Sequence, residues 1–181
     1  MANITLAVTG SISAYKAADL TSQLTKLGHK VTVLMSRSAM DFITPLTLQS
    51  LSKNLVHTDV MVEEDPSLIK HIDIAKETDL FLVAPASANT IAKLAHGMAD
   101  NIVTATALAL PIGIPKLIAP AMNTNMYLNP ATQKNLNTLE EYGFDEVKPR
   151  EALLACGDFG TGSLAEVTDI LEKVSNTLDK K

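Results

Sequence analysis

The sequence is poor in aromatic residues and in cysteine. It contains no Trp, three Tyr, four Phe and one Cys among 181 residues. A single Cys excludes an intramolecular disulfide and any metal site built only from thiolates. Aromatic residues make up 4% of the chain and the formal net charge is -5, so the protein lacks the rings and the cationic surface that nucleic-acid binding requires. The four His residues do not have metal-ligand spacing, and we expect no metal site.

The chain also lacks long uninterrupted apolar runs. Its longest apolar region, residues 102–114, is broken by Pro111 and Gly113. No stretch reaches the roughly 18 uncharged apolar residues that a membrane-spanning helix needs. Residues 1–10 carry no basic segment and too short an apolar run for a secretory signal. We therefore expect a cytoplasmic protein that engages neither membranes nor nucleic acid and keeps its thiol reduced.

What the sequence has instead is 46% apolar residues in alternating strand-like and helix-like segments. Apolar and β-branched runs predict strands, and helical spacing of apolar residues predicts the helices between them. The predicted strands cover residues 4–8, 31–35, 55–57, 80–84, 116–119 and 146–147. The predicted helices cover residues 13–27, a stretch capped by Ser36 and Ser38 that includes Met40, Phe42 and Ile43, a stretch ending near His96, and residues 101–110, 130–142 and 164–178. This alternation indicates one α/β domain over residues 1–181, a Rossmann-like or flavodoxin-like three-layer sandwich around a parallel sheet.

Small polar residues follow the strands at their carboxyl ends, which is where open parallel sheets bind ligands. They occur in residues 9–13, 36–38, 87–90 and 120–123. Each Ser or Thr taken alone indicates a helix cap. Four such loops at one edge favour a phosphate-bearing ligand, because helix N-termini present free N–H groups and partial positive charge. The first loop matches neither the G-x-G-x-x-G fingerprint nor a Walker P-loop, which leaves a mononucleotide phosphate open.

Three further segments carry candidate chemistry, and each also has an ordinary structural interpretation. Residues 120–127 interleave Met and Asn, which suits either a flat ligand or a turn with gap-filling Met. His71, after the acidic loop 63–66, is a general base or, as lone histidines usually are, a satisfied surface side chain. Cys156 lies in a glycine-rich segment, about 148–163, that predicts a mobile flap without regular structure. Its thiol suits packing as well as a site that the flap closes.

Several short motifs, taken together, resemble one known family. They are Gly10-Ser-Ile-Ser-Ala-Tyr-Lys16, His71-Ile72, Pro85-Ala-Ser-Ala-Asn-Thr90, Gly97-Met-Ala-Asp-Asn101, Pro120-Ala-Met-Asn-Thr-Asn-Met126 and Leu154-Ala-Cys-Gly157. Each is weak alone, but their order and placement over nearly the whole chain resemble the homo-oligomeric flavin-containing cysteine decarboxylases. Tyr127 departs from the family motif, which usually has Trp there, and this affects only local packing. The chain is similar to stand-alone members rather than to those fused to a synthetase domain.

The resemblance implies a cofactor, an assembly and a set of site residues. It implies FMN, held by Gly10, Ser11, Ile12, Ser36, Ser38, Ser87, Ala88, Asn89, Thr90 and Ala121. Among the catalytic residues it implies, His71 acts as base on the substrate thiol, Asn123 binds the substrate carboxylate and Cys156 donates a proton to the product. Met126 would shape the pocket and Lys76 would hold a substrate anion. The family forms trimers, or dodecamers of four trimers, so that His71 would serve the flavin of a neighbouring subunit.

The resemblance also implies a reaction. The expected substrate is 4'-phosphopantothenoylcysteine, decarboxylated to 4'-phosphopantetheine in coenzyme A biosynthesis. FMN takes a hydride from the cysteine Cβ, and the resulting thioaldehyde accepts the electrons as CO₂ leaves. One alternative is oxidative decarboxylation of a C-terminal peptidyl cysteine, which needs no final proton from Cys156. The other is a non-catalytic FMN-binding regulatory protein, against which the joint presence of His71, Asn123 and Cys156 argues. Flavin prenyltransferases share the fold, but we do not expect them to carry the Met-Asn motif or the Cys flap.

Overall fold

The protein is built on a six-stranded parallel sheet. The computed structural model describes residues 1–62 and 69–180, so the acidic loop expected at 63–66 lies outside the described residues. The strands of the sheet are β1 (Asn3–Val8), β2 (Lys30–Met35), β3 (Val56–His57), β4 (Leu80–Ala86), β5 (Lys116–Pro120) and β6 (Phe144–Glu146). Their order across the sheet is β3-β2-β1-β4-β5-β6, and every neighbouring pair is parallel. The predicted α/β class with a parallel sheet is confirmed.

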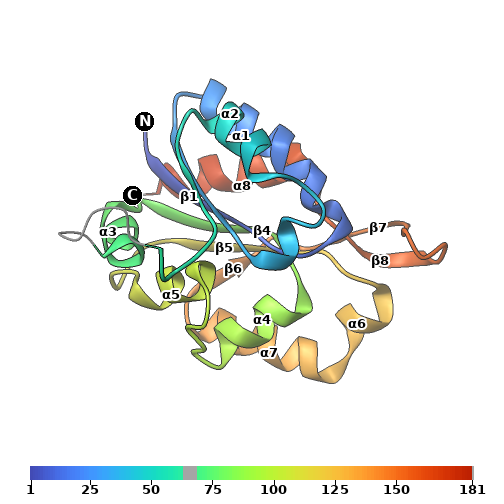
Figure 1. The fold of residues 1–181 in the computed structure, drawn as a ribbon. Coiled ribbons are helices and arrows are strands. Elements are labelled where there is room, and N and C mark those ends of the chain that lie inside the picture. Colours follow the sequence, from blue (N-terminus) through green and yellow to red (C-terminus); the bar gives the residue numbers. More distant parts are fainter. Residues whose placement is uncertain (63–68, 181) are drawn as a thin grey trace.

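Helices cover both faces of this sheet (Figure 1). One face carries α1 (Lys16–Lys26), α2 (Pro45–Ser52) and α8 (Val167–Leu178). The other face carries α3 (Lys70–Glu77), α4 (Ala88–Ala95), α5 (Ile102–Ala109) and α7 (Pro130–Glu141), and the short α6 (Thr124–Leu128) precedes α7. In the described part of the chain, no helix has the length and apolar character needed to cross a membrane.

The central strand β4 shows why the sheet needs cover on both sides. All seven of its residues are buried. Leu80 and Leu82 pack into the core beneath α1 and α8, whereas Phe81 and Val83 pack into the core beneath α4 and α7. Successive side chains of a strand point to opposite faces, so a continuous apolar run supplies both cores at once.

Two local predictions differ from the structure. The helix expected from Ser36 onward is only a 3-10 turn, Arg37–Ala39, and the α-helix begins later at Pro45. Thr44 caps that helix through its Oγ1, which accepts from the Thr47 amide, and proline suits the first helical position. Helix α3 was not expected at all, because its first flanking residue, Ile69, provides no side-chain cap.

The glycine-rich segment is regular, contrary to the prediction of a flap without regular structure. It forms an antiparallel hairpin of β7 (Arg150–Leu153) and β8 (Phe159–Ser163), which projects from the body of the molecule in Figure 1. Its tip is closed by the Leu154 amide donating to Asp158 O at 2.8 Å. Gly157, with φ of 91°, supplies the left-handed conformation that this turn requires. Cys156 therefore lies in the tip of a defined hairpin.

Candidate functional site

The strand order creates a crevice at the carboxyl ends of β1 and β4. The chain runs from β1 outward to β3 and then returns to β4 on the other side of β1. Loops diverge at such a switch point, and ligands bind there in open parallel sheets. Thr9 ties the two loops together, because its buried hydroxyl donates to Pro85 O at 2.7 Å and accepts from the Ser87 amide at 2.8 Å. These two hydrogen bonds hold the two loops in place on either side of the crevice.

A cavity of about 510 Å³ occupies this crevice. Its size falls in the range of small-molecule and cofactor sites. Its walls come from the loops after β1, β4 and β5 and from the β7–β8 hairpin. The predicted site residues that line it are Gly10, Ser11, Ile12, Ser87, Ala88, Ala121, Asn123, Met126 and Cys156.

Ser11 and Ser87 each cap a helical turn and also line the cavity. The Ser11 Oγ accepts from the Ser13 amide at 3.3 Å, and the Ser87 Oγ accepts from the Thr90 amide at 3.3 Å. Both serines are helix caps, and both line the cavity. The helical turns that they open direct their free N–H groups toward the same edge of the sheet, which suits an anion.

The remaining predicted cofactor contacts lie beside the cavity rather than along its wall. Ser38 packs directly against Gly10, since a Cβ built on Gly10 would stand 2.5 Å from the Ser38 Cβ. Ser36 starts the same 3-10 turn without a side-chain capping bond. Thr90 is buried, and its Oγ1 accepts a hydrogen bond from the Ser87 hydroxyl at 3.2 Å. Asn89 is exposed. The absence of a side chain at Gly10 therefore allows the first two loops to close around the crevice.

Asn123 and Cys156 are the two predicted catalytic residues that the structure brings together. Asn123 caps α6, because its Oδ1 accepts from the Asn125 amide at 2.8 Å. This bond orients the amide so that its Nδ2 donates to the Cys156 Sγ at 3.4 Å. The residues are 33 positions apart in sequence, and only the docking of the hairpin on the loop after β5 makes them neighbours.

The hairpin is fixed to that loop at its base. The Met122 amide donates to Gly162 O at 2.9 Å. A Cβ on Gly162 would stand 2.2 Å from Met122 O, so only glycine permits this approach. Gly160 lies close to Thr124, where a Cβ would stand 2.5 Å from the side-chain Oγ1. These glycines set the register of Cys156 against Asn123.

Tyr127 anchors the other end of the Asn123 loop. Its hydroxyl donates to the Glu146 Oε1 at 3.0 Å. Burial, together with the Glu146 carboxylate, raises the pKa of Tyr127 to about 12, so the phenol remains a hydrogen-bond donor at neutral pH. The ring is 9% exposed and packs in the core beneath α4 and α7. Tyr127 thus supplies a packed aromatic ring at the position where the family motif usually has tryptophan.

His71 and Lys76 do not line the cavity of their own chain. Both lie on α3, which Figure 1 places at the end of the molecule away from the hairpin. The His71 Nδ1 is buried and makes no hydrogen bond to the described residues. The Lys76 Nζ lies 3.6 Å from the Asp73 Oδ1 and is largely exposed. A single chain therefore assembles only part of the predicted catalytic set.

Two cations that the sequence did not single out line the cavity. They are Lys16 and Arg150, and both reach Glu166 at the start of α8. The Lys16 Nζ lies 3.6 Å from the Glu166 Oε2, and the Arg150 Nε lies 3.0 Å from the Glu166 Oε1. The Lys16 side chain is only 17% exposed. Lys16 belongs to one of the motifs named above. Arg150 could not be identified from the sequence, because its ion pair with Glu166, 16 residues later, leaves no local sequence pattern.

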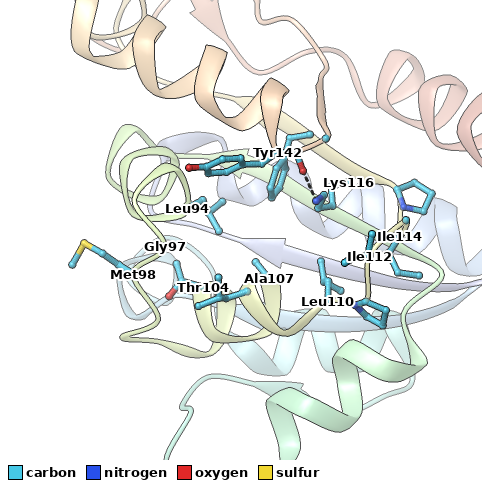
Figure 2. A pocket seen from close by; sticks show the side chains of 16 residues that line it. Leu94, Gly97, Met98, Thr104, Ala107, Leu110, Ile112, Ile114, Lys116 and Tyr142 are labelled. Carbon is cyan, nitrogen blue, oxygen red and sulfur yellow. Dashed lines mark hydrogen bonds between the residues drawn. The ribbon is translucent and has the colours of Figure 1, made fainter.

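A second cavity, of about 630 Å³, opens at the amino ends of β5 and β6 (Figure 2). Apolar side chains from α4, α5 and the segment before β5 line it, and Figure 2 shows the Lys116 amine bonded to the Tyr142 carbonyl, at 2.5 Å. Burial lowers the pKa of Lys116. None of the predicted site residues lines this cavity, and the polar side chains among its described lining residues are Thr104, Lys116 and Tyr142. The chemistry therefore belongs to the cavity above β1 and β4.

Comparisons with known proteins identify the family of the chain. The model of the family described as Flavoprotein matches residues 1–179. A probable phosphopantothenoylcysteine decarboxylase of Streptococcus mutans serotype c is 60% identical over 175 residues, which cover 97% of this chain and 98% of that protein. The coenzyme A biosynthesis bifunctional protein CoaBC of Bacillus subtilis is 47% identical over 170 residues, which cover 94% of this chain. The chain spans 41% of the length of that bifunctional relative.

Solved structures are similar over the whole chain. A cysteine-to-serine variant of PPC decarboxylase, complexed with pantothenoylaminoethenethiol, has a TM-score of 0.91 at 31% identity and covers 98% of both chains. The FMN binding protein AtHal3 has a TM-score of 0.87 at 32% identity, covering 99% of this chain and 98% of that one. Peptidyl-cysteine decarboxylase EpiD has a TM-score of 0.80 at 28% identity, covering 97% of this chain and 99% of that one.

Proposed function

Because this chain belongs to the Flavoprotein family, we propose that it binds FMN and decarboxylates 4'-phosphopantothenoylcysteine to 4'-phosphopantetheine in coenzyme A biosynthesis. The flavin-containing family expected from the motifs is thereby confirmed. One relative is named for this decarboxylase and another for coenzyme A biosynthesis, which supports the substrate. The observation that carries the proposal is the contact between Asn123 and Cys156 inside the cavity at the switch point.

The residues around the cavity fit a flavin mononucleotide. The turns opened by Ser11 and Ser87 offer N–H groups to a phosphate, and the loop at Gly10 has no side chain to obstruct it. Ala121, small and buried, offers a flat surface to an aromatic ring. Bound FMN would supply the two-electron oxidation of the substrate cysteine Cβ that makes loss of CO₂ feasible, and it would return the hydride to that carbon to give phosphopantetheine and oxidised flavin.

Replacing Gly10 with Ala is expected to weaken FMN binding by about tenfold to a hundredfold, because overpacking of this kind costs about 1–3 kcal/mol. The added Cβ would stand 2.5 Å from the Ser38 Cβ and force the first two loops apart. Titration of the apoprotein with FMN, followed by flavin fluorescence, measures the change in Kd.

The matched test of this steric cause is a double-variant cycle with Ser38→Gly, which removes the atom that the new methyl meets. Gly10→Ala should have little further effect in the Ser38→Gly background. An equal loss of affinity in both backgrounds would contradict the steric explanation.

Asn123 is the residue placed to hold the substrate carboxylate. Its Oδ1 is occupied by the Asn125 amide, and its Nδ2 has a second N–H, besides the one donated to Cys156, that can bind a ligand in the cavity. An amide donor binds a carboxylate without the charge that would hold CO₂ back once it forms. Met126, on the helix α6 that Asn123 caps, adds a flexible apolar side chain to the cavity wall. Asn123 thus orients the leaving carboxylate, while Cys156 stands next to it as the proton donor for the product carbon.

Lys16 and Arg150 fit the phosphorylated end of the proposed substrate. They place two cations on the cavity wall, and Glu166 holds both of them. A phosphate monoester carries about 1.5 to 2 negative charges near pH 7 and accepts charge-assisted hydrogen bonds from such groups. A C-terminal peptidyl cysteine carries no such phosphate. The pair therefore favours the phosphopantothenoyl substrate over the peptide alternative.

We assign the general base of each site to His71 from a neighbouring subunit of a trimer or dodecamer. The observation behind this assignment is that α3 does not reach the cavity of its own chain. The buried, unpartnered Nδ1 of His71 is consistent with a side chain whose polar contacts are completed by another molecule. Lys76, five residues further along α3, would meet the substrate anion from the same neighbouring helix.

The direct test is to load purified protein with FMN and incubate it with 4'-phosphopantothenoylcysteine. We expect 4'-phosphopantetheine and CO₂, detected by mass spectrometry. A parallel incubation with a peptide ending in cysteine should release no CO₂. A protein that takes up no FMN, or that processes the peptide and not the phosphopantothenoyl compound, would overturn the proposal.

Replacing Cys156 with Ser is expected to change the product rather than stop the reaction. The hydroxyl is a much weaker acid than a thiol, so the product carbon is not protonated after CO₂ leaves. The FMN-loaded variant should release CO₂ in an amount stoichiometric with its flavin and accumulate the enethiol instead of phosphopantetheine. Complete turnover to phosphopantetheine at the rate of the unchanged protein would contradict the proton-donor role.

A further inference from the structure

We propose that Asp158 returns a proton from solvent to the Cys156 thiolate after each turnover. The inference rests on the proposed function, in which Cys156 gives up a proton in every cycle. It concerns a carboxylate that neither the motifs nor the cofactor contacts had assigned.

The hairpin tip places the two side chains against each other. The Cys156 Sγ donates to the Asp158 Oδ2 at 3.4 Å. The turn is held by the Leu154 amide on Asp158 O at 2.8 Å and the Gly157 amide on Leu154 O at 2.9 Å. Gly157, between the two residues, has the left-handed conformation with φ of 91°. The contact is therefore a product of the fold of the tip.

The sulfur has a different neighbour on each side. The Asn123 Nδ2 donates to it at 3.4 Å, and the Asp158 carboxylate accepts from it at 3.4 Å. An amide does not release protons near neutrality, so Asn123 cannot restore the thiol. Of the two described side chains that hydrogen-bond to the sulfur, Asp158 is the one that can exchange a proton. It is exposed, so water reaches its other oxygen.

The proton balance closes with these groups and water. In the turnover, the S–H bond of Cys156 breaks and a C–H bond forms at the carbon that lost CO₂, leaving a thiolate. An O–H bond of protonated Asp158 then breaks, the S–H bond re-forms, and the carboxylate takes its next proton from hydronium or a buffer acid. An ordinary carboxylic acid is stronger than an ordinary thiol by about four to five pKa units, so this transfer is downhill.

The kinetic test separates the first turnover from the later ones. FMN-loaded Asp158→Asn starts with a protonated Cys156, so we expect an initial burst of one phosphopantetheine per flavin at the unchanged rate. Later turnovers should then slow by at least about tenfold, because the acid that restores the thiol is missing. Quenched-flow sampling with mass detection measures both phases. Asp158→Glu should retain most of the steady-state rate.

Rescue by an added acid distinguishes a relay from a structural role. In Asp158→Ala, acetate should raise the steady-state rate in proportion to its acid form, and it should leave the burst unchanged. Glu151→Gln is the matched control, because it removes a carboxylate of the same hairpin that accepts a hydrogen bond from Thr161 rather than from Cys156. Its burst and its steady state should both match the unchanged protein.

Alkylation of the thiol supplies a readout that needs no turnover. Cys156 is the only cysteine in the chain, so its reaction with iodoacetamide is seen without background. Removing the carboxylate that accepts the S–H proton favours the thiolate, and Asp158→Asn should react about threefold to tenfold faster at neutral pH. Unchanged alkylation, a reduced burst, or a steady state equal to that of the unchanged protein would each overturn the relay. Absence of phosphopantetheine from the unchanged protein would instead overturn the proposed function itself.

Discussion

Asn123→Asp is expected to lower the rate of phosphopantetheine formation by about a hundredfold to a thousandfold, the usual loss on removing one well-placed donor. The variant keeps the acceptor that caps α6, because an aspartate oxygen can still receive the Asn125 amide. It replaces the Nδ2 donor, now 3.4 Å from the Cys156 Sγ, with a negatively charged oxygen. That oxygen would face the substrate carboxylate and repel it. The change thus removes one function of the side chain and leaves its structural function in place.

The rate is measured by mass spectrometry on protein of equal FMN content. Asn125→Asp is the matched control, because it makes the same charge change two residues along the same short helix, on an exposed side chain. We expect this control to retain nearly full activity and both variants to bind FMN normally. Activity of Asn123→Asp close to that of the unchanged protein would rule out a carboxylate-binding role, and an equal loss in the control would assign the effect to charge alone.

His71→Asn is expected to abolish phosphopantetheine formation, and activity should return when its subunits are mixed with subunits of Asn123→Asp. Neither variant alone has a complete site. A mixed oligomer contains sites that combine His71 from one subunit with the cavity of another. In every trimer that contains both variants, one of the three interface sites receives both intact residues. Activity is expected to return because His71 lies on a helix that does not reach the cavity of its own chain, whereas Asn123 lines that cavity.

Co-expression with two different affinity tags, followed by purification on both, yields the mixed oligomers. Pairing Asn123→Asp with Cys156→Ser is the control. These two residues touch within one chain at 3.4 Å, so every site in that mixture lacks one of them and no phosphopantetheine should form. Restoration in the control, or none in the first mixture, would contradict a site shared between subunits.

The sequence predicts the parts of this site that depend on local chemistry. Ser11 and Ser87 are caps that also line the cavity, and both properties follow from a hydroxyl directly after a buried strand. The β4 strand was evident because a run buried on both faces is apolar throughout. In these cases the signal and the structure lie within a few residues of each other.

Other parts of the site depend on contacts that no local pattern records. The glycines of the hairpin suggested flexibility, yet Gly162 is there because Met122 O leaves no room for a Cβ. Arg150 acquires its place through Glu166, 16 residues later, on a different element. Helix α3 starts without a capping side chain, and its packing against α5, rather than its sequence, establishes it. Packing between distant segments therefore decided what the sequence alone could not.

The bond between the Met122 amide and Gly162 O couples the hairpin to the neighbouring loop. It fastens the hairpin at its foot to the loop that carries Asn123, so the foot cannot swing outward without dragging that loop along. The tip contacts the same loop through the bond between Asn123 and Cys156. The hairpin therefore meets the loop at two places, its foot and its tip. Substitutions at the foot are expected to displace Cys156 relative to Asn123, although neither of these residues is changed.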